Sequence, residues 1–271
     1  MSVATEIQNL ETNIRGAYAK VSEKGGTLPN NKNTENLADS IDTIPTGGGE
    51  FIGVPREISQ DGLFQIPTVM EEFTIPSNAT SLGTYAFYNA LRGCQSLVSV
   101  DMGTITSISG NYALGGAFNG CSNLANLNLS NLKTIESGTN SGCYQMCYNC
   151  TSLTAIDLGK LESINGTGGF LDAFYGCSNL SSVNLSSLSS IPAGSALKTA
   201  FRNCTSLKSL SFPALTANSF GTNTNQFNNM LQGCTNVTIH FPASVRSTIQ
   251  SWSDVTAKFG AAGSTNIRYD L

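Results

Sequence analysis

Hydrophobic residues recur along this chain with a period of 27 to 30 residues. The most regular of them is a cysteine, found at Cys94, Cys121, Cys150, Cys177, Cys204 and Cys234. Apolar residues follow the first five of these cysteines at offsets of three, six and eight positions, as in Leu124, Leu127 and Leu129, and the last unit is one residue shorter, with Ile239 and Phe241 in the later two places. A fixed period of this length is typical of a solenoid, in which each repeat packs only on its neighbours.

The residues after each cysteine alternate between apolar and small polar types, which is the pattern of a half-buried strand. An earlier unit that lacks the cysteine fits the same frame through Met70, Phe73 and Ile75, so the sequence predicts seven rungs. The strands are expected near residues 97–102, 124–129, 153–158, 180–185 and 207–212.

The residues before each cysteine follow a different pattern. With the cysteine as position 0, apolar residues occupy positions −7, −4, −3 and 0, as in Phe170, Ala173, Phe174 and Cys177. This spacing is the apolar stripe of a short helix. Position −1 always holds Gly or Asn, which end helices in a left-handed conformation. The predicted fold is an α/β solenoid over residues 51–241, right-handed, with a short strand, a loop and a short helical turn in each unit.

Two phrases of the repeat are nearly identical, AFNGCSNL at residues 117–124 and AFYGCSNL at residues 173–180. They resemble the BspA-like leucine-rich-repeat family, and the resemblance covers about residues 67–241. It implies the fold and a repeat of about 27 residues. The family includes adhesins and many proteins of unknown role, so the resemblance leaves the function open.

Residues 1–45 predict a small helical segment. Its apolar residues from Ile7 to Val21 step by three and four, which favours a short coiled coil or a bundle with a second helix that begins at Thr34. Residues 46–50 are Gly-rich, as in a flexible linker. The segment is similar to the N-terminal segment of tailed-phage and prophage structural proteins, through residues 19–29 and 36–41. That resemblance implies an assembly or attachment segment and a homotrimer through its helix.

Residues 242–271 predict a cap for the C-terminal end of the stack, because the last rung of a solenoid would otherwise expose its core. Ser244 can cap a helix that carries Val245, Ile249, Trp252 and Phe259 on one side. An alternating stretch at the end of the chain, Ile267, Tyr269 and Leu271, predicts one more strand.

Charged residues make up 12% of the chain and the net charge is −4, so a nucleic-acid partner is not expected. No apolar run reaches membrane-spanning length, so no membrane partner is expected either. The first residues lack the features of a secretory signal, which favours cytoplasmic synthesis, with a virion as the destination if the phage resemblance holds. The eight cysteines are then expected to be reduced.

Two patterns invite a catalytic or metal interpretation. Cys143, Cys147 and Cys150 have the spacing that holds an iron–sulfur cluster in radical enzymes, but all three lie in core columns of the repeat. His240 is the only histidine and stands at an outward strand position without an evident partner. We therefore expect no cofactor, no metal and no enzymatic activity.

Two faces of the stack are candidates for binding. The outer side of the predicted helical turns carries residue types that dominate interface energetics, namely Tyr88, Arg92, Tyr144, Tyr148, Tyr175 and Arg202. The strand face carries small polar residues, among which Asp101, Asn128 and Asp157 could bind a cation or sugar hydroxyls, or could simply be solvated.

The sequence thus predicts a non-enzymatic recognition protein that binds a protein or a glycan. With the phage resemblance, it would be a structural or accessory protein that faces a host molecule. A phage-encoded inhibitor of a host protein complex and a bacterial surface adhesin are the alternatives. A trimer would favour the virion protein and a monomer the inhibitor.

Overall fold

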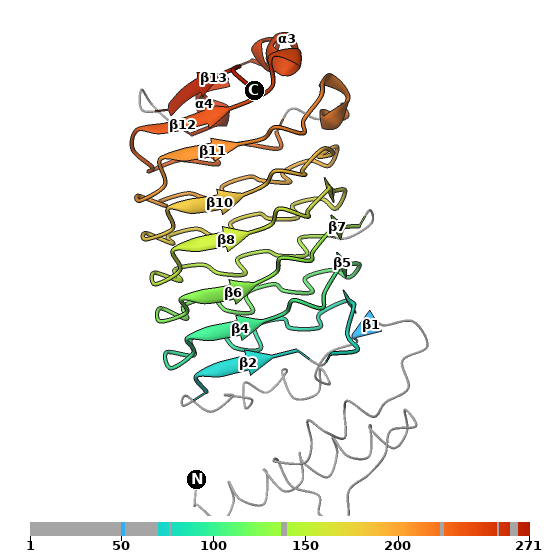
Figure 1. The fold of residues 1–271 in the computed structure, drawn as a ribbon, viewed down its shortest axis with the longest axis vertical. Helices are drawn as coiled ribbons and strands as arrows, with labels where there is room; N and C mark the ends of the chain where they lie inside the picture. Colours follow the sequence, from blue (N-terminus) through green and yellow to red (C-terminus); the bar gives the residue numbers. More distant parts are fainter. Residues whose placement is uncertain are drawn as a thin grey trace, which may run out of the picture.

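The chain winds into one stack of similar turns (Figure 1). The structure is a computed structural model that describes residues 50–51, 70–75, 77–136, 140–222, 225–253, 255–260 and 265–271. The predicted helical segment at residues 1–45 and the linker residues 46–49 lie outside the described residues. Glu50, predicted as the last linker residue, already belongs to the first strand, β1 (Glu50–Phe51).

One column of parallel strands runs along the stack, and most of its strands have three residues. Its members are β2 (Glu72–Thr74), β4 (Ser99–Asp101), β6 (Asn126–Asn128), β8 (Ala155–Asp157), β10 (Ser182–Asn184), β11 (Ser209–Ser211) and β12 (Val237–His240). The five predicted strands are confirmed, each shorter than expected. Equivalent residues pair in register, as Phe73 does with Val100 and Val100 with Leu127. The middle residue points inward and its two neighbours outward.

A second column of parallel strands, which the sequence analysis had assigned to loops, forms another edge of the stack. It joins β1, β3 (Ser81–Leu82), β5 (Ser107–Ile108), β7 (Thr134–Ile135) and β9 (Ser163–Ile164). The strands β3, β5, β7 and β9 each end in a buried aliphatic residue, and those residues pair from rung to rung. The rungs of β2, β4, β6 and β8 therefore each have two short strands and one long turn segment.

The turn segments before each cysteine are not helical, and this part of the fold prediction is wrong. In the rung of Cys177, the N–H groups of Leu171, Ala173, Tyr175 and Cys177 donate to the carbonyl three residues back. The N–H groups of the residues between them donate to the next rung, namely Phe170 to Ala196, Asp172 to Lys198, Phe174 to Ala200 and Gly176 to Arg202. An α-helix would instead send every N–H to the carbonyl four residues back.

A left-handed residue at every fourth position produces this alternation. In the same rung Gly168, Asp172 and Gly176 have φ angles of 64°, 55° and 74°. Each such residue ends one tight turn and starts the next. Two adjacent residues in every four then point inward, and this gives the i, i+3, i+4, i+7 spacing that a helix also gives. The predicted buried positions are therefore right although the predicted helix is wrong.

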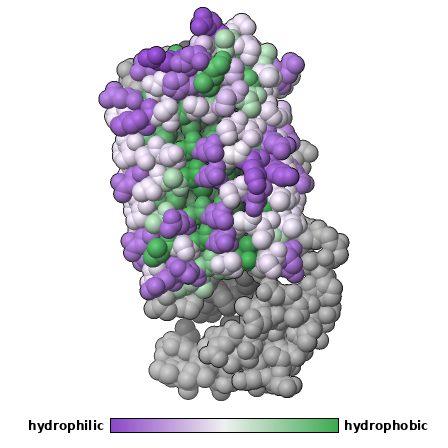
Figure 2. Space-filling view, viewed as in Figure 1, coloured by the Kyte–Doolittle hydropathy of each residue, from purple (hydrophilic) through white to green (hydrophobic). Residues whose placement is uncertain are grey.

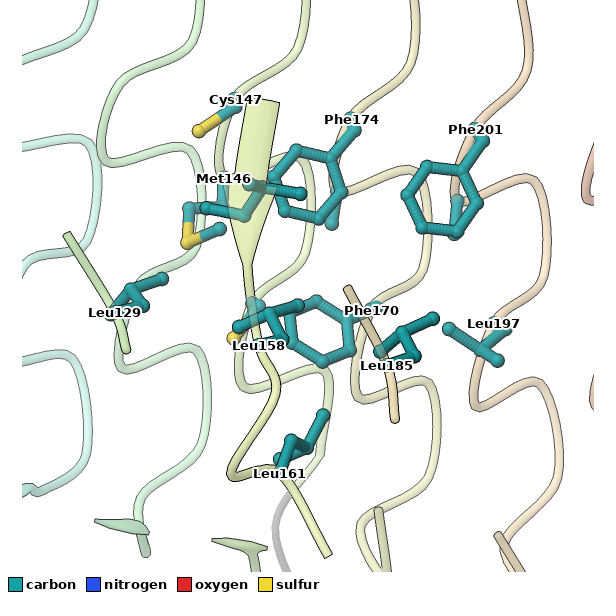
Figure 3. Packing of buried hydrophobic residues seen from close by; sticks show 14 of the residues in the cluster. Leu129, Met146, Cys147, Leu158, Leu161, Phe170, Phe174, Leu185, Leu197 and Phe201 are labelled. Carbon is teal, nitrogen blue, oxygen red and sulfur yellow. The ribbon is translucent and has the colours of Figure 1, made fainter. Parts of the chain in front are cut away.

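The core is one continuous column through all rungs. Phe174 stacks on Phe201 of the next rung with ring centroids 5.6 Å apart and planes within 7°. Figure 3 shows these two rings with Phe170, Leu158 and Leu185 in the same interior. Because each rung packs its core side chains against the neighbouring rungs, no rung can bury its core alone.

All eight cysteines are free and buried. The repeat cysteines have a specific partner, since the thiol of each one donates to a backbone carbonyl of the preceding rung. Cys150 donates to Phe118, Cys177 to Cys147 and Cys204 to Phe174, with Sγ to oxygen distances of 3.1 Å.

The C-terminal cap is confirmed, with shorter helices than expected. It contains η3 (Ala243–Val245), α3 (Arg246–Gln250) and α4 (Val255–Lys258), and β13 (Thr265–Arg268) pairs with β12. The four predicted apolar residues of the cap are buried. Trp252 meets Phe220 of η2 (Ala217–Phe220) edge to face, with centroids 5.1 Å apart. Ser244 lies inside η3, whose N-cap is Pro242, so the predicted serine cap is wrong.

Candidate functional site

The turn segments present one aromatic face, called here the turn face. Its rings and charges are Tyr85, Tyr88, Arg92, Tyr112, Tyr144, Tyr148, Asp172, Tyr175, Lys198 and Arg202. Six of the eight tyrosines of the chain lie on it. The four-residue turn period causes this clustering, because it turns positions −2 and −6 outward in every rung.

Four tyrosines of the turn face touch one another at its N-terminal end. Tyr85 is stacked on Tyr112, with ring centroids 5.9 Å apart and planes within 8°. Tyr88 meets the rings of Tyr85 and Tyr112 edge to face at 5.4 and 5.8 Å. Tyr144 of the following rung meets Tyr112 edge to face at 6.2 Å. The cluster therefore joins three successive rungs.

A glycine makes room for this cluster. Gly115 occupies position −6, where the neighbouring rungs carry Tyr88 and Tyr144. A Cβ atom at Gly115 would lie 2.9 Å from the Cδ2 atom of Tyr88 and 3.1 Å from the Cβ atom of Tyr112. Any side chain there would push the rings apart. The tyrosine cluster therefore depends on glycine at position 115.

A second aromatic group lies further along the turn face. The rings of Tyr148 and Tyr175 are stacked, with centroids 4.4 Å apart and planes within 6°. The guanidinium carbon of Arg202 lies over the Tyr175 ring, 5.4 Å from its centroid. The three side chains stand at position −2 of consecutive rungs and form a ladder, called here the Tyr–Tyr–Arg stack. Both faces of the Tyr175 ring are therefore covered from within the chain.

Two phenols of this face, those of Tyr144 and Tyr148, have a raised pKa. Burial raises the pKa of Tyr148 first, and the adjacent Tyr175 and the charge of Asp172 raise it further, while Arg202 opposes them. The pKa of Tyr144 is also raised, mainly by burial and then by Asp172. Both hydroxyls can therefore donate and accept hydrogen bonds at neutral pH.

Arg202 is a charged residue of the turn face without an ion-pair partner among the described residues. Its Nε atom is shielded from solvent and has no hydrogen-bond partner. Among the described residues no carboxylate lies within salt-bridge distance of its guanidinium. An unpaired N–H of a charged group that is shielded from water costs free energy.

The strand face looks different, because its polar residues bond to one another. Asp101 Oδ1 accepts hydrogen bonds from Gly103 N at 2.8 Å and Asn128 Nδ2 at 2.7 Å. Asp157 Oδ1 likewise accepts from Gly159 N and from Asn184 Nδ2 of the next rung. The predicted trio of Asp101, Asn128 and Asp157 is thus divided between two separate pairs. On this geometry the aspartates tie turns and rungs together.

The described residues expose few large hydrophobic side chains. Figure 2 shows hydrophilic residues along both sides of the stack, with a narrow line of hydrophobic residues between them. Among the described residues the exposed large hydrophobic side chains are Tyr88, Val98 and Leu271.

His240 has a partner that the sequence analysis missed. Its Nδ1 atom lies 2.8 Å from Asp270 Oδ1, which comes after β13. The pair is partly exposed and joins the last two strands of the stack. In the part of the chain that the structure describes, no group of three or more His, Cys, Asp or Glu residues could hold a metal ion. The three closely spaced cysteines are core residues, and burial raises the pKa of Cys143 strongly.

The structure brings most of the predicted turn-face residues together. Tyr88 and Tyr144 belong to the four-ring cluster, and Tyr148, Tyr175 and Arg202 form the stack. Arg92 is exposed. Tyr85 and Tyr112 were not predicted as part of this face, because they occupy position −9, outside the segment from position −7 that was expected to be helical.

No helix among the described residues is both long and apolar enough to cross a membrane.

The fold and the repeat define a leucine-rich-repeat solenoid. The model of the BspA type leucine rich repeat region matches residues 57–193 and 145–252, more than half of the chain. The chain therefore belongs to the BspA-type leucine-rich-repeat family. Folds of this kind are typically binding scaffolds rather than enzymes. The match begins at residue 57 and so does not reach the N-terminal segment.

Solved structures similar to this chain include three leucine-rich-repeat or antigen structures. The leucine-rich-repeat protein TpLRR of T. pallidum is 21% identical, over 62% of this chain and 68% of that chain, with a TM-score of 0.32. The pneumococcal vaccine antigen PcpA is 19% identical, over 65% of this chain and 41% of that chain, with a TM-score of 0.39. A leucine-rich-repeat protein of Bacteroides ovatus is 21% identical, over 69% and 65%, with a TM-score of 0.22. Comparison with curated proteins finds no match.

Proposed function

We propose that this chain is a non-enzymatic recognition protein that binds its ligand through the turn face. The observation that carries the proposal is the gathering of six tyrosines on one face, where they form two contacting groups. Tyr and Arg provide most of the binding energy at protein interfaces, and they do so best when they are held rigidly. Rings that already pack against each other lose little conformational entropy on binding.

The size of this face also suits a macromolecular ligand. It extends over five rungs, from the rung of Tyr85 to the rung of Arg202. Four steps of ~4.8 Å give a length of about 19 Å. That length, with the width of the turns, suits a ligand that contacts several rungs at once, whereas a small molecule would fit within one.

The strand face is the weaker candidate. Its aspartates and asparagines already hydrogen bond to turns and to neighbouring rungs. A ligand would have to compete with those bonds. We therefore assign recognition to the turn face and a structural role to Asp101, Asn128 and Asp157.

Within this proposal the chain acts as a phage-type structural or accessory protein that faces a host molecule. Support comes from the sequence pattern of residues 19–29 and 36–41, which resembles phage structural proteins. An intracellular inhibitor of a host protein complex and a bacterial surface adhesin are the alternatives. Sedimentation of the full chain separates the first two, because a trimer supports the virion protein and a monomer supports the inhibitor.

Arrays of purified host proteins and host glycans test the recognition function. The full chain, a chain without residues 1–49, and the triple variant Tyr148→Ala/Tyr175→Ala/Arg202→Ala would each be applied. We expect the full chain and the truncated chain to bind the same ligands on the arrays. We expect the triple variant not to bind those ligands. The proposal fails if the triple variant binds like the full chain, or if the truncated chain binds nothing.

A further inference from the structure

The Tyr–Tyr–Arg stack has a geometry that selects among ligand chemistries. Sugar rings bind aromatic side chains by lying on an open ring face. The Tyr175 ring has no open face, since Tyr148 lies on one side at 4.4 Å and Arg202 on the other at 5.4 Å. Tyr175 can therefore present only its ring edge and its hydroxyl group to a ligand, next to the guanidinium of Arg202.

The positively charged guanidinium of Arg202 favours a ligand that carries a negative charge. Arg202 carries a shielded Nε without a hydrogen-bond partner and has no carboxylate within salt-bridge distance among the described residues. The contact with the Tyr175 ring restrains the Arg202 side chain, and the planar guanidinium group matches the two oxygens of a carboxylate. Lys198, four residues before Arg202, adds a second positive charge to the same face.

We infer that the Tyr–Tyr–Arg stack is a recognition site for a carboxylate on the surface of a protein partner, an aspartate or glutamate side chain that Arg202 pairs with and the Tyr148 and Tyr175 hydroxyls flank. This inference rests on the proposed function and narrows its ligand to an acidic protein surface. The positive charge on this part of the turn face, within a chain of net charge −4, supplies the complementarity.

Asp172 gives the inference an internal check. Its charge is felt by Tyr144 and Tyr148, so it lies near the stack, yet it forms no ion pair with Arg202. A carboxylate ligand would be repelled by Asp172. Asp172 has a φ of 55°, a conformation that asparagine adopts readily. The change Asp172→Asn therefore removes the charge while keeping the turn.

The chain also contains a matched control. Arg246 in the C-terminal cap lies over the ring of Tyr269, with its guanidinium carbon 5.1 Å from the centroid. It repeats the arginine–tyrosine contact of Arg202, but it lies outside the turn face and has no second tyrosine behind the ring. Arg202→Gln and Arg246→Gln remove the same charge from the two places.

The probe for this test is poly-L-glutamate, with hyaluronate as an acidic glycan and poly-L-lysine as a charge control. Calorimetric titration of the full chain should show binding of poly-L-glutamate and no binding of poly-L-lysine. Arg202→Gln should weaken the affinity about tenfold or more, which corresponds to about 1.4 kcal/mol. Arg246→Gln should change it less than about twofold, and Asp172→Asn should strengthen it.

Other outcomes would overturn the inference. Absence of poly-L-glutamate binding excludes a carboxylate site. Equal losses in the two arginine variants mean that the probe responds only to net charge. Tighter binding of hyaluronate, lost in Arg202→Gln, assigns the stack to an acidic glycan instead. None of these results contradicts the proposed function, provided that the Tyr148→Ala/Tyr175→Ala/Arg202→Ala variant still fails to bind the array ligands that the full chain binds.

Discussion

The thiol of Cys204 donates a hydrogen bond to the backbone carbonyl of Phe174 in the preceding rung, over 3.1 Å. Phe174 O also accepts the N–H of Cys177 within its own turn. The repeated cysteine thus joins consecutive rungs at a point where the alternating turns send no backbone N–H across. Cysteine suits this position because its side chain is small, tolerates burial and carries a thiol that can act as a weak hydrogen-bond donor.

Cys204→Ala should therefore cost more than a buried cysteine that makes no such bond. Cys143 is the matched control, because it is fully buried and its thiol donates no hydrogen bond to any of the described residues. We expect Cys204→Ala to lower the free energy of unfolding by about 1 kcal/mol more than Cys143→Ala, the net value of one hydrogen bond. Urea denaturation measures both. Equal costs would show that the thiol acts only as a space filler.

The buried thiols also predict how stability depends on pH. Burial raises the pKa of Cys121 from 9.0 to about 12 and that of Cys234 to about 11. A folded-state pKa above the unfolded value means that the folded state holds its proton more tightly. The free energy of unfolding should therefore be constant below the unfolded pKa, near 9, and should fall as pH rises through the range from 9 to 12.

Urea titrations at pH 7.5, 9 and 10.5 measure this loss. The double variant Cys121→Ala/Cys234→Ala is the control, and its stability should fall less steeply over the same range. Native thiol alkylation at about pH 8 should be slow in the unmodified chain for the same reason. Stability that stays level or rises up to pH 10.5 contradicts this account of the cysteines.

Two adjacent aromatic residues test which side chains face the core. Phe174 is fully buried and stacks on Phe201, whereas Tyr175 is only partly buried and stacks on Tyr148 at the surface. Phe174→Ala should cost roughly 3–5 kcal/mol, as for other buried phenylalanines. Tyr175→Ala should cost about 1 kcal/mol, from the lost ring contact. Thermal and urea unfolding would report both, and similar costs would refute the assigned phase of the turns.

One position of the turn ladder holds an unfavourable residue. Thr199 is β-branched, has a φ of 54° and carries a shielded hydroxyl without a hydrogen-bond partner. Equivalent positions in other rungs hold asparagine, at Asn89 and Asn229. Thr199→Asn should therefore raise the free energy of unfolding by about 1 kcal/mol, the cost of a left-handed conformation for an ordinary residue.

The neighbouring change Lys198→Asn is the control for Thr199→Asn, since Lys198 is not among the positive-φ residues and should gain nothing. Differential scanning calorimetry of both variants gives the comparison. A lower Tm for Thr199→Asn than for the unmodified chain would show that the strain attributed to this position is absent.

The sequence was sufficient to predict the rungs, the inward residues and five strands, because each follows from a period that is directly visible. It did not predict the turn ladder. A helix and a series of four-residue turns bury the same positions over two turns, so Phe170, Ala173, Phe174 and Cys177 fit both.

The residues at positions −5 and −9 carry the signal that distinguishes a series of four-residue turns from a helix. A helix needs a left-handed residue only at its end, but here Gly168 and Asp172 adopt that conformation within the segment. Their counterparts in other rungs include Gln145, Tyr112 and Thr199, which hide the trend. The aromatic contacts of the turn face, and the pairing of Asp101 with Asn128, depend on rung spacing and could be seen only in three dimensions.

The central claim is that the turn face, and not the strand face, recognises the ligand. The most direct test is the dissociation constant for the array position that the full chain binds most tightly. Tyr148→Ala/Tyr175→Ala/Arg202→Ala should weaken this binding by about tenfold or more, or about 1.4 kcal/mol. Asp101→Ala/Asn128→Ala/Asp157→Ala should change it less than about twofold, although it removes the bonds to Gly103 and Gly159 and so lowers the Tm. The reverse ranking of the two triple variants, measured on folded protein, would contradict the claim.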